Sequence, residues 1–123
     1  VVATVQCLED NSMVKEAVLE PGNGRVLVID AGGSMQRAVV GDQIAARAAS
    51  NGWRGFVVHG CIRDSAEISK IDIGVKAMGT HPRKTEKRNI GIRDISVSFA
   101  STSFQPDDYI IVDEDGIVVG EQN

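Results

Sequence analysis

The sequence predicts an α/β domain with a mixed, β-rich sheet and few helices. Apolar residues make up 42% of the chain and aromatic residues only 4%, so the core must be built mainly from Val, Ile and Ala. Such richness in β-branched residues favours strands. Two apolar runs bounded by polar or glycine residues, RVLVID at 25–30 and GFVVHG at 55–60, are typical of buried strands. With 123 residues we expect one domain, spanning residues 1–123.

The elements follow from these patterns in chain order. Val1–Cys7 (VVATVQC) predicts a strand. Glu9–Glu20 predicts a helix, because its apolar residues recur at helical spacing behind a cap at Asp10 or Asn11. Gly41–Asn51 (GDQIAARAASN) predicts a second helix with one apolar face. The remaining predicted elements are a turn at 21–24, strands at 25–30 and 55–60, a loop at 31–34, extended pieces at 35–40 and 72–77, a helical turn at 65–69, a basic loop at 81–88, and strands at 95–101, 102–104, 109–113 and 116–119 around a turn at 106–108.

Composition narrows the class of protein. The net charge of −4 argues against direct binding of nucleic acid, which needs a basic face. The two cysteines, Cys7 and Cys61, predict reduced thiols in a cytoplasmic protein. No run approaches the roughly 20 apolar residues of a membrane span. The sequence begins at Val1 with a strand pattern and has no initiator Met. We therefore expect the natural N-terminal segment to be absent.

One spacing in the sequence indicates a candidate functional site. Gly41-Asp42 is followed, after twenty residues, by Arg63-Asp64. Asp42 lies at the start of a predicted helix, and Arg63-Asp64 lies in the loop just past a buried strand. A helix start and the carboxyl end of the following strand can converge on one crevice. That crevice would hold anion-binding backbone N–H groups, a guanidinium and carboxylates, with Glu67 three positions after Asp64. The pattern predicts a site for a small anion and a divalent metal ion.

The chain as a whole resembles the RraA family, named for the regulator of ribonuclease activity A, which also contains the 4-hydroxy-4-methyl-2-oxoglutarate aldolases. The matching motifs, in order, are VQCLEDN, GRVLVIDAGGS, GDQIA, GWRGFVVHGCIRD, DIGVKAMGTHPRK and PDDYIIVDEDGIVV. The resemblance implies a swivelling β/β/α domain assembled as a ring-shaped homotrimer, stacked into a hexamer in some members. Members usually carry an additional N-terminal helical segment.

The resemblance also implies an activity. In the active members an Asp–X20–Arg–Asp pattern forms the site, and it is intact at Asp42, Arg63 and Asp64. Arg63 would bind the 2-oxo acid, Asp64 would reach Mg²⁺ or Mn²⁺, and Asp42 would orient or activate a water that carries the proton. The backbone N–H groups of Gly41, Asp42, Gln43 and Ile44 would hold the substrate carboxylate. The expected enzyme is a class II, divalent-metal aldolase or an oxaloacetate decarboxylase, since both reactions pass through the same enolate. Active members also take an acidic residue from a neighbouring subunit, and Glu121 is the candidate for it here.

Simpler interpretations stand beside these. Asp42 could serve only as a helix cap, worth about 1 kcal/mol, and Arg63-Asp64 could be a surface ion pair. Arg93-Asp94 is the same dipeptide, but no helix start precedes it at the right distance, so we expect a solvated strand entry. Glu67 is a candidate ligand, and the alternative is a side chain that is simply exposed to solvent.

Other features are assigned to structure. The loop at 32–34 lacks the Gly-X-Gly-X-X-Gly spacing of a dinucleotide site. His59 and His81 are not at zinc-binding spacing to Cys61, so we expect a packed and an exposed histidine. The basic run at 83–88 is expected to be a solvated loop, and Trp53 a packing anchor. The rival function is a non-catalytic regulator that binds and inhibits ribonuclease E, and a third interpretation is a vestigial oligomer that binds anions without turnover.

Overall fold

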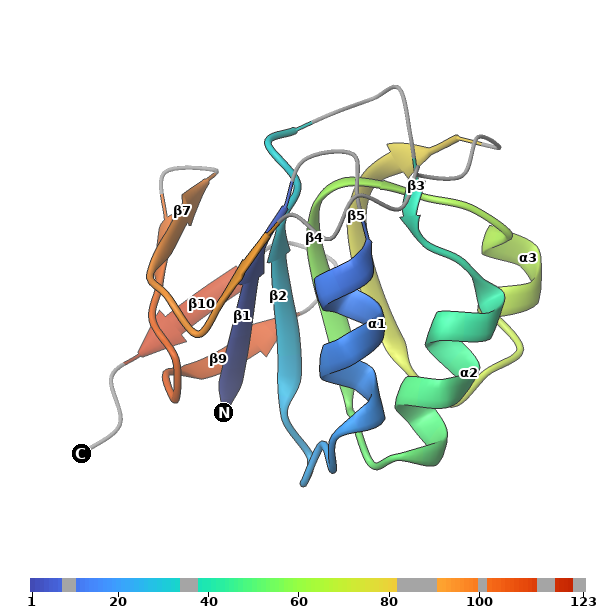
Figure 1. Cartoon of the computed structure of the whole chain (residues 1–123), viewed down its shortest axis with the longest axis horizontal. Helices are drawn as coiled ribbons and strands as arrows, with labels where there is room; N and C mark the ends of the chain where they lie inside the picture. The colour runs from blue at the N-terminus through green and yellow to red at the C-terminus, as the bar shows by residue number, and fades with distance from the viewer. Residues whose placement is uncertain (8–10, 34–37, 82–90, 100–101, 113–116, 121–123) are drawn as a thin grey trace.

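The computed structural model describes residues 1–7, 11–33, 38–81, 91–99, 102–112 and 117–120 (Figure 1). Within these residues a six-stranded sheet has the order β3–β4–β2–β1–β6, and β5 pairs with β4. All its pairings are parallel except that of β1 with β6. Its strands are β1 (Val2–Gln6), β2 (Val26–Asp30), β3 (Ala38–Val40), β4 (Gly55–Ile62), β5 (Gly74–Thr80) and β6 (Ile92–Arg93).

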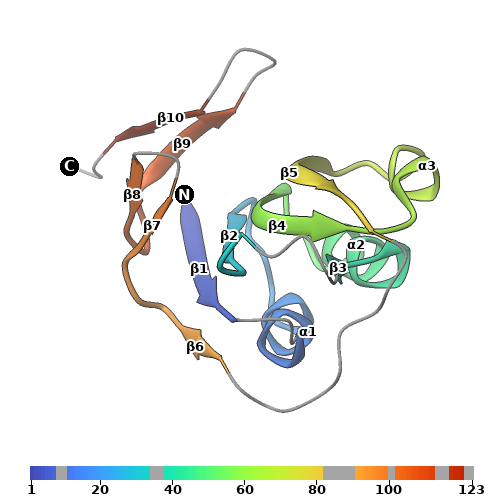
Figure 2. The same ribbon diagram turned by 90° about the horizontal axis from the view of Figure 1, so that it is seen from above.

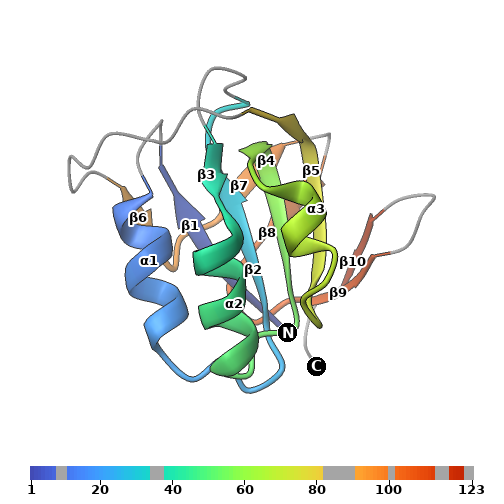
Figure 3. The ribbon, with the colours of Figure 1, turned by 90° about the vertical axis from the view of Figure 1, so that its right-hand side faces the viewer.

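Helices and hairpins cover opposite faces of this sheet. Seen from above, α1 (Ser12–Leu19) and α2 (Asp42–Ser50) lie on one side, and two antiparallel hairpins lie on the other (Figure 2). The short α3 (Ser65–Ile68) follows β4 and lies beside α2, as the view from the helical side shows (Figure 3). The hairpins are β7 (Val97–Phe99) with β8 (Thr102–Phe104), and β9 (Tyr109–Val112) with β10 (Ile117–Gly120).

The period of two along each strand divides the core between the two faces. Phe56 and Val58 of β4 pack with the buried faces of α1 and α2. Val57, between them in sequence, packs with Val28 and with Phe104 of the β7–β8 hairpin. Both faces of the central strands are therefore buried, which explains why the two apolar runs in the sequence are continuous rather than alternating.

The sheet register brings two distant chain segments together. β3 pairs with β4 through Val40 and Ile62, so the residues that follow, Gly41 and Arg63, leave the sheet side by side. The Arg63 N–H donates to the Val40 carbonyl oxygen at 2.9 Å, which fixes this exit. The site predicted from the spacing is thus placed at the carboxyl edge of the parallel strands, where α/β sheets bind ligands.

The predicted fold class is confirmed, with local corrections. β4 ends at Ile62 rather than at residue 60, because β3 and β5 continue to pair with its last residues. α1 begins at Ser12, and Asn11 caps it without a side-chain hydrogen bond. The strand predicted at 95–101 begins later, at Val97, and is described to Phe99. Segments 8–10, 34–37, 82–90, 100–101, 113–116 and 121–123 lie outside the described residues, and with them the basic run at 83–88 and Glu121.

Several smaller expectations can also be checked. Cys7 and Cys61 are buried thiols, and burial raises the pKa of Cys61. Trp53 is buried, with its ring N–H donating to the Glu20 carbonyl oxygen and the Arg25 guanidinium over its face. None of the helices in the described ranges has the length and apolarity to cross a membrane.

Arg93 is not the solvated residue that the sequence predicted. It lies on β6, at the edge of the sheet opposite β3, and its side chain is only 17% exposed. Its guanidinium donates to both Glu20 carboxylate oxygens, at 2.9 and 2.6 Å, and to Glu16 at 3.2 Å. The hydrogen bond from Arg93 holds the pKa of Glu20 below its ordinary value. Arg93 therefore ties β6 to the end of α1.

We expect Arg93→Ala to lower the free energy of unfolding by about 1 kcal/mol at neutral pH, the upper range for ion pairs at a surface. Because the pKa of Glu20 is lowered in the folded state, the contribution of the pair is present above the ordinary pKa of glutamate. It is lost as the pH falls through the lowered value, so wild type and variant should converge in acid. Urea unfolding at both pH values measures this difference. An undiminished difference in acid would show that lost packing, not charge, causes the effect.

Candidate active site

The start of α2 presents a row of backbone donors. The first hydrogen bond of the helix runs from the Ala45 N–H to the Gly41 carbonyl oxygen, so the helix offers no acceptor to the N–H groups of Asp42, Gln43 and Ile44. Gly41 precedes the helix in an extended conformation. A helix start of this kind carries partial positive charge and suits a carboxylate or another small anion.

The Arg63 guanidinium lies directly against Gly41. A Cβ atom at Gly41 would lie 2.8 Å from Cζ and 2.9 Å from Nε of Arg63, closer than real Cβ atoms approach any neighbour. The absence of a side chain at this position therefore lets the guanidinium reach the helix start. Because Arg63 is only 25% exposed, its fork of donors is held close to the protein surface.

Asp64 completes the arrangement in an unusual backbone conformation. Its φ of 57° and ψ of 39° are left-handed, which few residues other than glycine, asparagine and aspartate adopt. Its Oδ2 atom accepts a hydrogen bond from Arg63 Nη1 at 2.9 Å and a long one from the Asp42 N–H at 3.5 Å. A strained residue that is held between a guanidinium and a helix start is typical of a functional site.

The structure brings together four of the predicted site residues, Gly41, Asp42, Arg63 and Asp64. Gln43 and Ile44 can contribute only their backbone N–H groups. The Ile44 side chain is buried in the core, and Gln43 lines a groove between α1 and α2. Glu67, the further ligand candidate, is exposed and lies 3.6 Å from Lys70 in an ion pair.

The residues of this site suit a divalent cation that needs only one or two protein ligands. Within the described ranges, no group of three or more His, Cys, Asp or Glu side chains is placed to hold a metal ion. The Asp64 carboxylate lies beside the donors, with 34% of its side chain exposed. Magnesium keeps several waters and accepts one or two carboxylates, so this donor set suits it better than zinc, which takes several protein ligands.

Sequence reasoning missed one polar cluster. His59 Nδ1 lies 3.1 Å from Asp30 Oδ1, and the imidazole stacks on Phe99 with ring centroids 4.7 Å apart. The Gly33 N–H donates to the His59 carbonyl oxygen, so the glycine-rich loop closes on the protein itself. Asp30 and His59 are paired positions on β2 and β4. Only the strand register, which the sequence does not reveal, brings them together.

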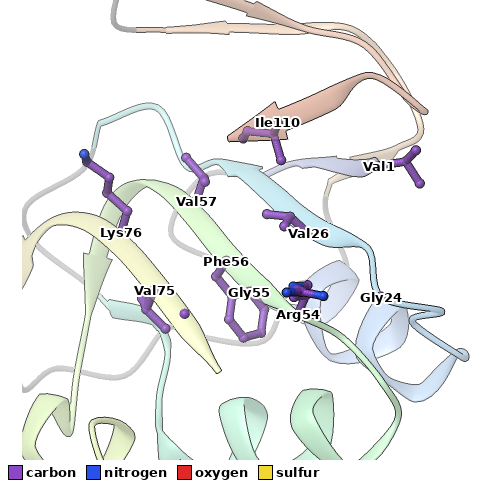
Figure 4. A pocket seen from close by; sticks show the side chains of 11 residues that line it. Val1, Gly24, Val26, Arg54, Gly55, Phe56, Val57, Val75, Lys76 and Ile110 are labelled. Carbon is purple, nitrogen blue, oxygen red and sulfur yellow. The ribbon is translucent and has the colours of Figure 1, made fainter. Parts of the chain in front are cut away.

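A cavity larger than the groove at Gln43 lies elsewhere among the described residues. It has a volume of about 750 Å³ and is lined by the first residues of β2, β4 and β5, together with Ile110 of β9. Figure 4 shows Val26, Val57 and Ile110 lining this cavity. Because the strands are parallel, their amino ends are at the opposite end of the sheet from Arg63, which follows the last residue of β4. The cavity is therefore separate from the candidate site.

These features define an α/β protein in which an Arg–Asp pair lies against the start of a helix. The chain belongs to the RraA-like family, because the family model described as Aldolase/RraA matches residues 1–119.

Individual relatives agree with this assignment. A protein of Alkalilimnicola ehrlichii named "Putative 4-hydroxy-4-methyl-2-oxoglutarate aldolase" is 55% identical over 122 residues, which are 99% of this chain and 76% of the relative. A solved structure from Geobacillus kaustophilus, described as an S-adenosylmethionine: 2-dimethylmenaquinone methyltransferase, is 43% identical with a TM-score of 0.96, covering 99% of this chain and 76% of that one. The RNA-processing inhibitor RraA from Thermus thermophilis is 36% identical with a TM-score of 0.95, covering 97% and 73%. The RraA-like fold is therefore established.

Proposed function

We propose that this protein is a divalent-metal-dependent lyase of small 2-oxo acids. Its reaction is retro-aldol cleavage of 4-hydroxy-4-methyl-2-oxoglutarate, decarboxylation of oxaloacetate, or both, with release of pyruvate. The observation that carries the proposal is the contact of the Arg63 guanidinium and the Asp64 carboxylate at the start of α2. The name of the relative from Alkalilimnicola ehrlichii supports the aldolase reaction.

Substrate recognition follows from the donors. The N–H groups of Asp42, Gln43 and Ile44 point out of the start of α2 and suit the substrate carboxylate. Arg63 contributes charge-assisted hydrogen bonds to the 2-oxo acid, each worth about 1.5–3 kcal/mol. These donors recognise the carboxylate and the neighbouring keto oxygen, which every 2-oxo acid shares, and leave the rest of the substrate to vary.

The chemistry uses the same donors. In either reaction the bond between the third and fourth carbon atoms breaks, and its electron pair stays on the third carbon as the enolate of pyruvate. Negative charge then develops on the keto oxygen, where a preplaced donor lowers the barrier by about 3–4 kcal/mol. A water held by Asp42 takes the proton of the 4-hydroxyl group in the aldol cleavage and returns one to the enolate carbon. Asp64 would hold a divalent cation, which would supply further Lewis-acid stabilisation of the developing negative charge.

The proposed assembly is a homotrimer. Leu19 and Met78 are exposed large hydrophobic side chains, at 58% and 52%, on α1 and on the edge strand β5. An interface between copies would bury these two side chains. Sedimentation analysis measures the mass directly.

The test is pyruvate release from each of the two substrates, with Mg²⁺ or Mn²⁺ and with a chelator. We expect release above the solution background that requires the metal ion, and the faster substrate will identify the main reaction. A folded protein that binds the metal ion but releases no pyruvate would refute the lyase. Ribonuclease E binding would then be measured, because the relative from Thermus thermophilis is described as an RNA-processing inhibitor.

A further inference from the structure

The Asp64 carboxylate lies against two of the donors that a substrate carboxylate would use. Its Oδ2 atom takes a hydrogen bond from Arg63 Nη1 at 2.9 Å and lies 3.5 Å from the Asp42 backbone nitrogen. One oxygen makes both contacts, so it lies between the guanidinium and the helix start. That is the position in which an incoming carboxylate would receive both donors.

Two carboxylates at this position would compete with each other. Both would draw on the same Arg63 nitrogen and the same backbone N–H group, and two negative charges at hydrogen-bond distance from one donor repel each other, so the first carboxylate weakens binding of the second. The left-handed backbone of Asp64 holds its side chain next to Arg63, so the competing group is always present at high local concentration. Asp64 therefore opposes substrate binding for as long as it keeps these contacts.

We propose that Asp64 is a built-in competitor of the substrate, released from Arg63 and the helix start when its carboxylate binds a divalent cation. The inference rests on the proposed function and adds a regulatory step to the same site. The cation and the 2-oxo acid then bind with positive coupling, since each favours the arrangement in which Asp64 has left Arg63. Couplings of this kind typically change affinity by roughly 5- to 150-fold. The partial exposure of Arg63 and Asp64 places the expected effect near the lower end.

The experiment measures binding of pyruvate to metal-free protein by calorimetry or by chemical-shift titration, without turnover. We expect Asp64→Asn to bind pyruvate about tenfold more tightly than wild type in the presence of a chelator. Asparagine keeps the shape of the side chain and tolerates the left-handed backbone, so the substitution removes the charge without straining the loop. Adding Mg²⁺ should tighten pyruvate binding to wild type but not to the variant.

Glu67→Gln is the matched control. It removes one negative charge three residues away, from an exposed side chain outside the described contacts of Arg63. If the gain in Asp64→Asn came only from reduced general repulsion, Glu67→Gln would gain similarly, and the competitor role would be refuted. Equal pyruvate affinity of wild type and Asp64→Asn without metal ion would also refute it.

These outcomes can be separated from failure of the proposed function. Metal-dependent pyruvate release by wild type, together with unchanged metal-free affinity in Asp64→Asn, overturns the competitor role alone. Absence of both pyruvate release and pyruvate binding in every sample overturns the lyase and the competitor role together.

Discussion

Asp64→Asn should lose nearly all metal-stimulated pyruvate release. A neutral amide binds Mg²⁺ far more weakly than a carboxylate, and Asp64 is the carboxylate that contacts the Arg63 guanidinium and the helix start. Stabilisation of a developing oxyanion by one preplaced group is worth about 3–4 kcal/mol, so we expect a fall of roughly 10²- to 10³-fold, to the rate measured with a chelator. Steady-state kinetics over a range of Mg²⁺ concentrations provides the measurement.

The chain contains a closely matched control for this experiment. Asp94 follows Arg93 in an identical dipeptide, and its φ of 59° is nearly that of Asp64. Asp94→Asn makes the same chemical change at a residue with a similar positive φ, next to β6 at the far edge of the sheet. We expect its kinetics to be nearly unchanged. Equal losses of pyruvate release in the two variants would mean that Asp64 has no special role. Retained activity in Asp64→Asn would show that Asp64 is not the metal ligand.

The sequence predicted well that Asp42, Arg63 and Asp64 lie together, for a local reason. A helix that begins at Asp42 and a buried strand that ends before Arg63 are both visible in short stretches of sequence. In a parallel sheet, those two ends fall at the same edge. The spacing was therefore sufficient to predict which residues meet, and the structure confirms their proximity. Their roles in binding and catalysis remain predictions.

The contacts within the site could not be predicted in the same way. The left-handed conformation of Asp64 and the packing of Arg63 on Gly41 depend on backbone geometry that no residue pattern specifies. Arg93 illustrates the same limit. Its partners Glu16 and Glu20 precede it by 77 and 73 residues, so its dipeptide looked solvated until the sheet order placed β6 next to α1. Contacts between distant segments depend on the tertiary fold, whereas periodicity reports only local structure.

Gly41→Ala should separate the position of Arg63 from the fold of the protein. The backbone of Gly41 is extended, with φ of −120°, which alanine adopts without strain. The new Cβ would, however, lie 2.8 Å from Arg63 Cζ, so the flexible guanidinium must move away from the helix start. We expect kcat/KM to fall by roughly 10- to 150-fold, the equivalent of about 1.5–3 kcal/mol for a charge-assisted hydrogen bond. The free energy of unfolding should fall by less than about 1 kcal/mol.

Two comparisons make this prediction specific. Gly74→Ala is the same substitution on β5, where the nearest atom to the new Cβ is a backbone oxygen at an ordinary 3.9 Å, so its activity should be nearly that of wild type. The second comparison repeats Gly41→Ala in an Arg63→Ala background. If the alanine acts by displacing Arg63, it should lower kcat/KM only slightly once the guanidinium is gone, because both changes then remove the same interaction. Losses that multiply would instead mean that Gly41 acts through the helix start itself. A Gly41→Ala protein as active as wild type would show that catalysis does not need the guanidinium in its present place.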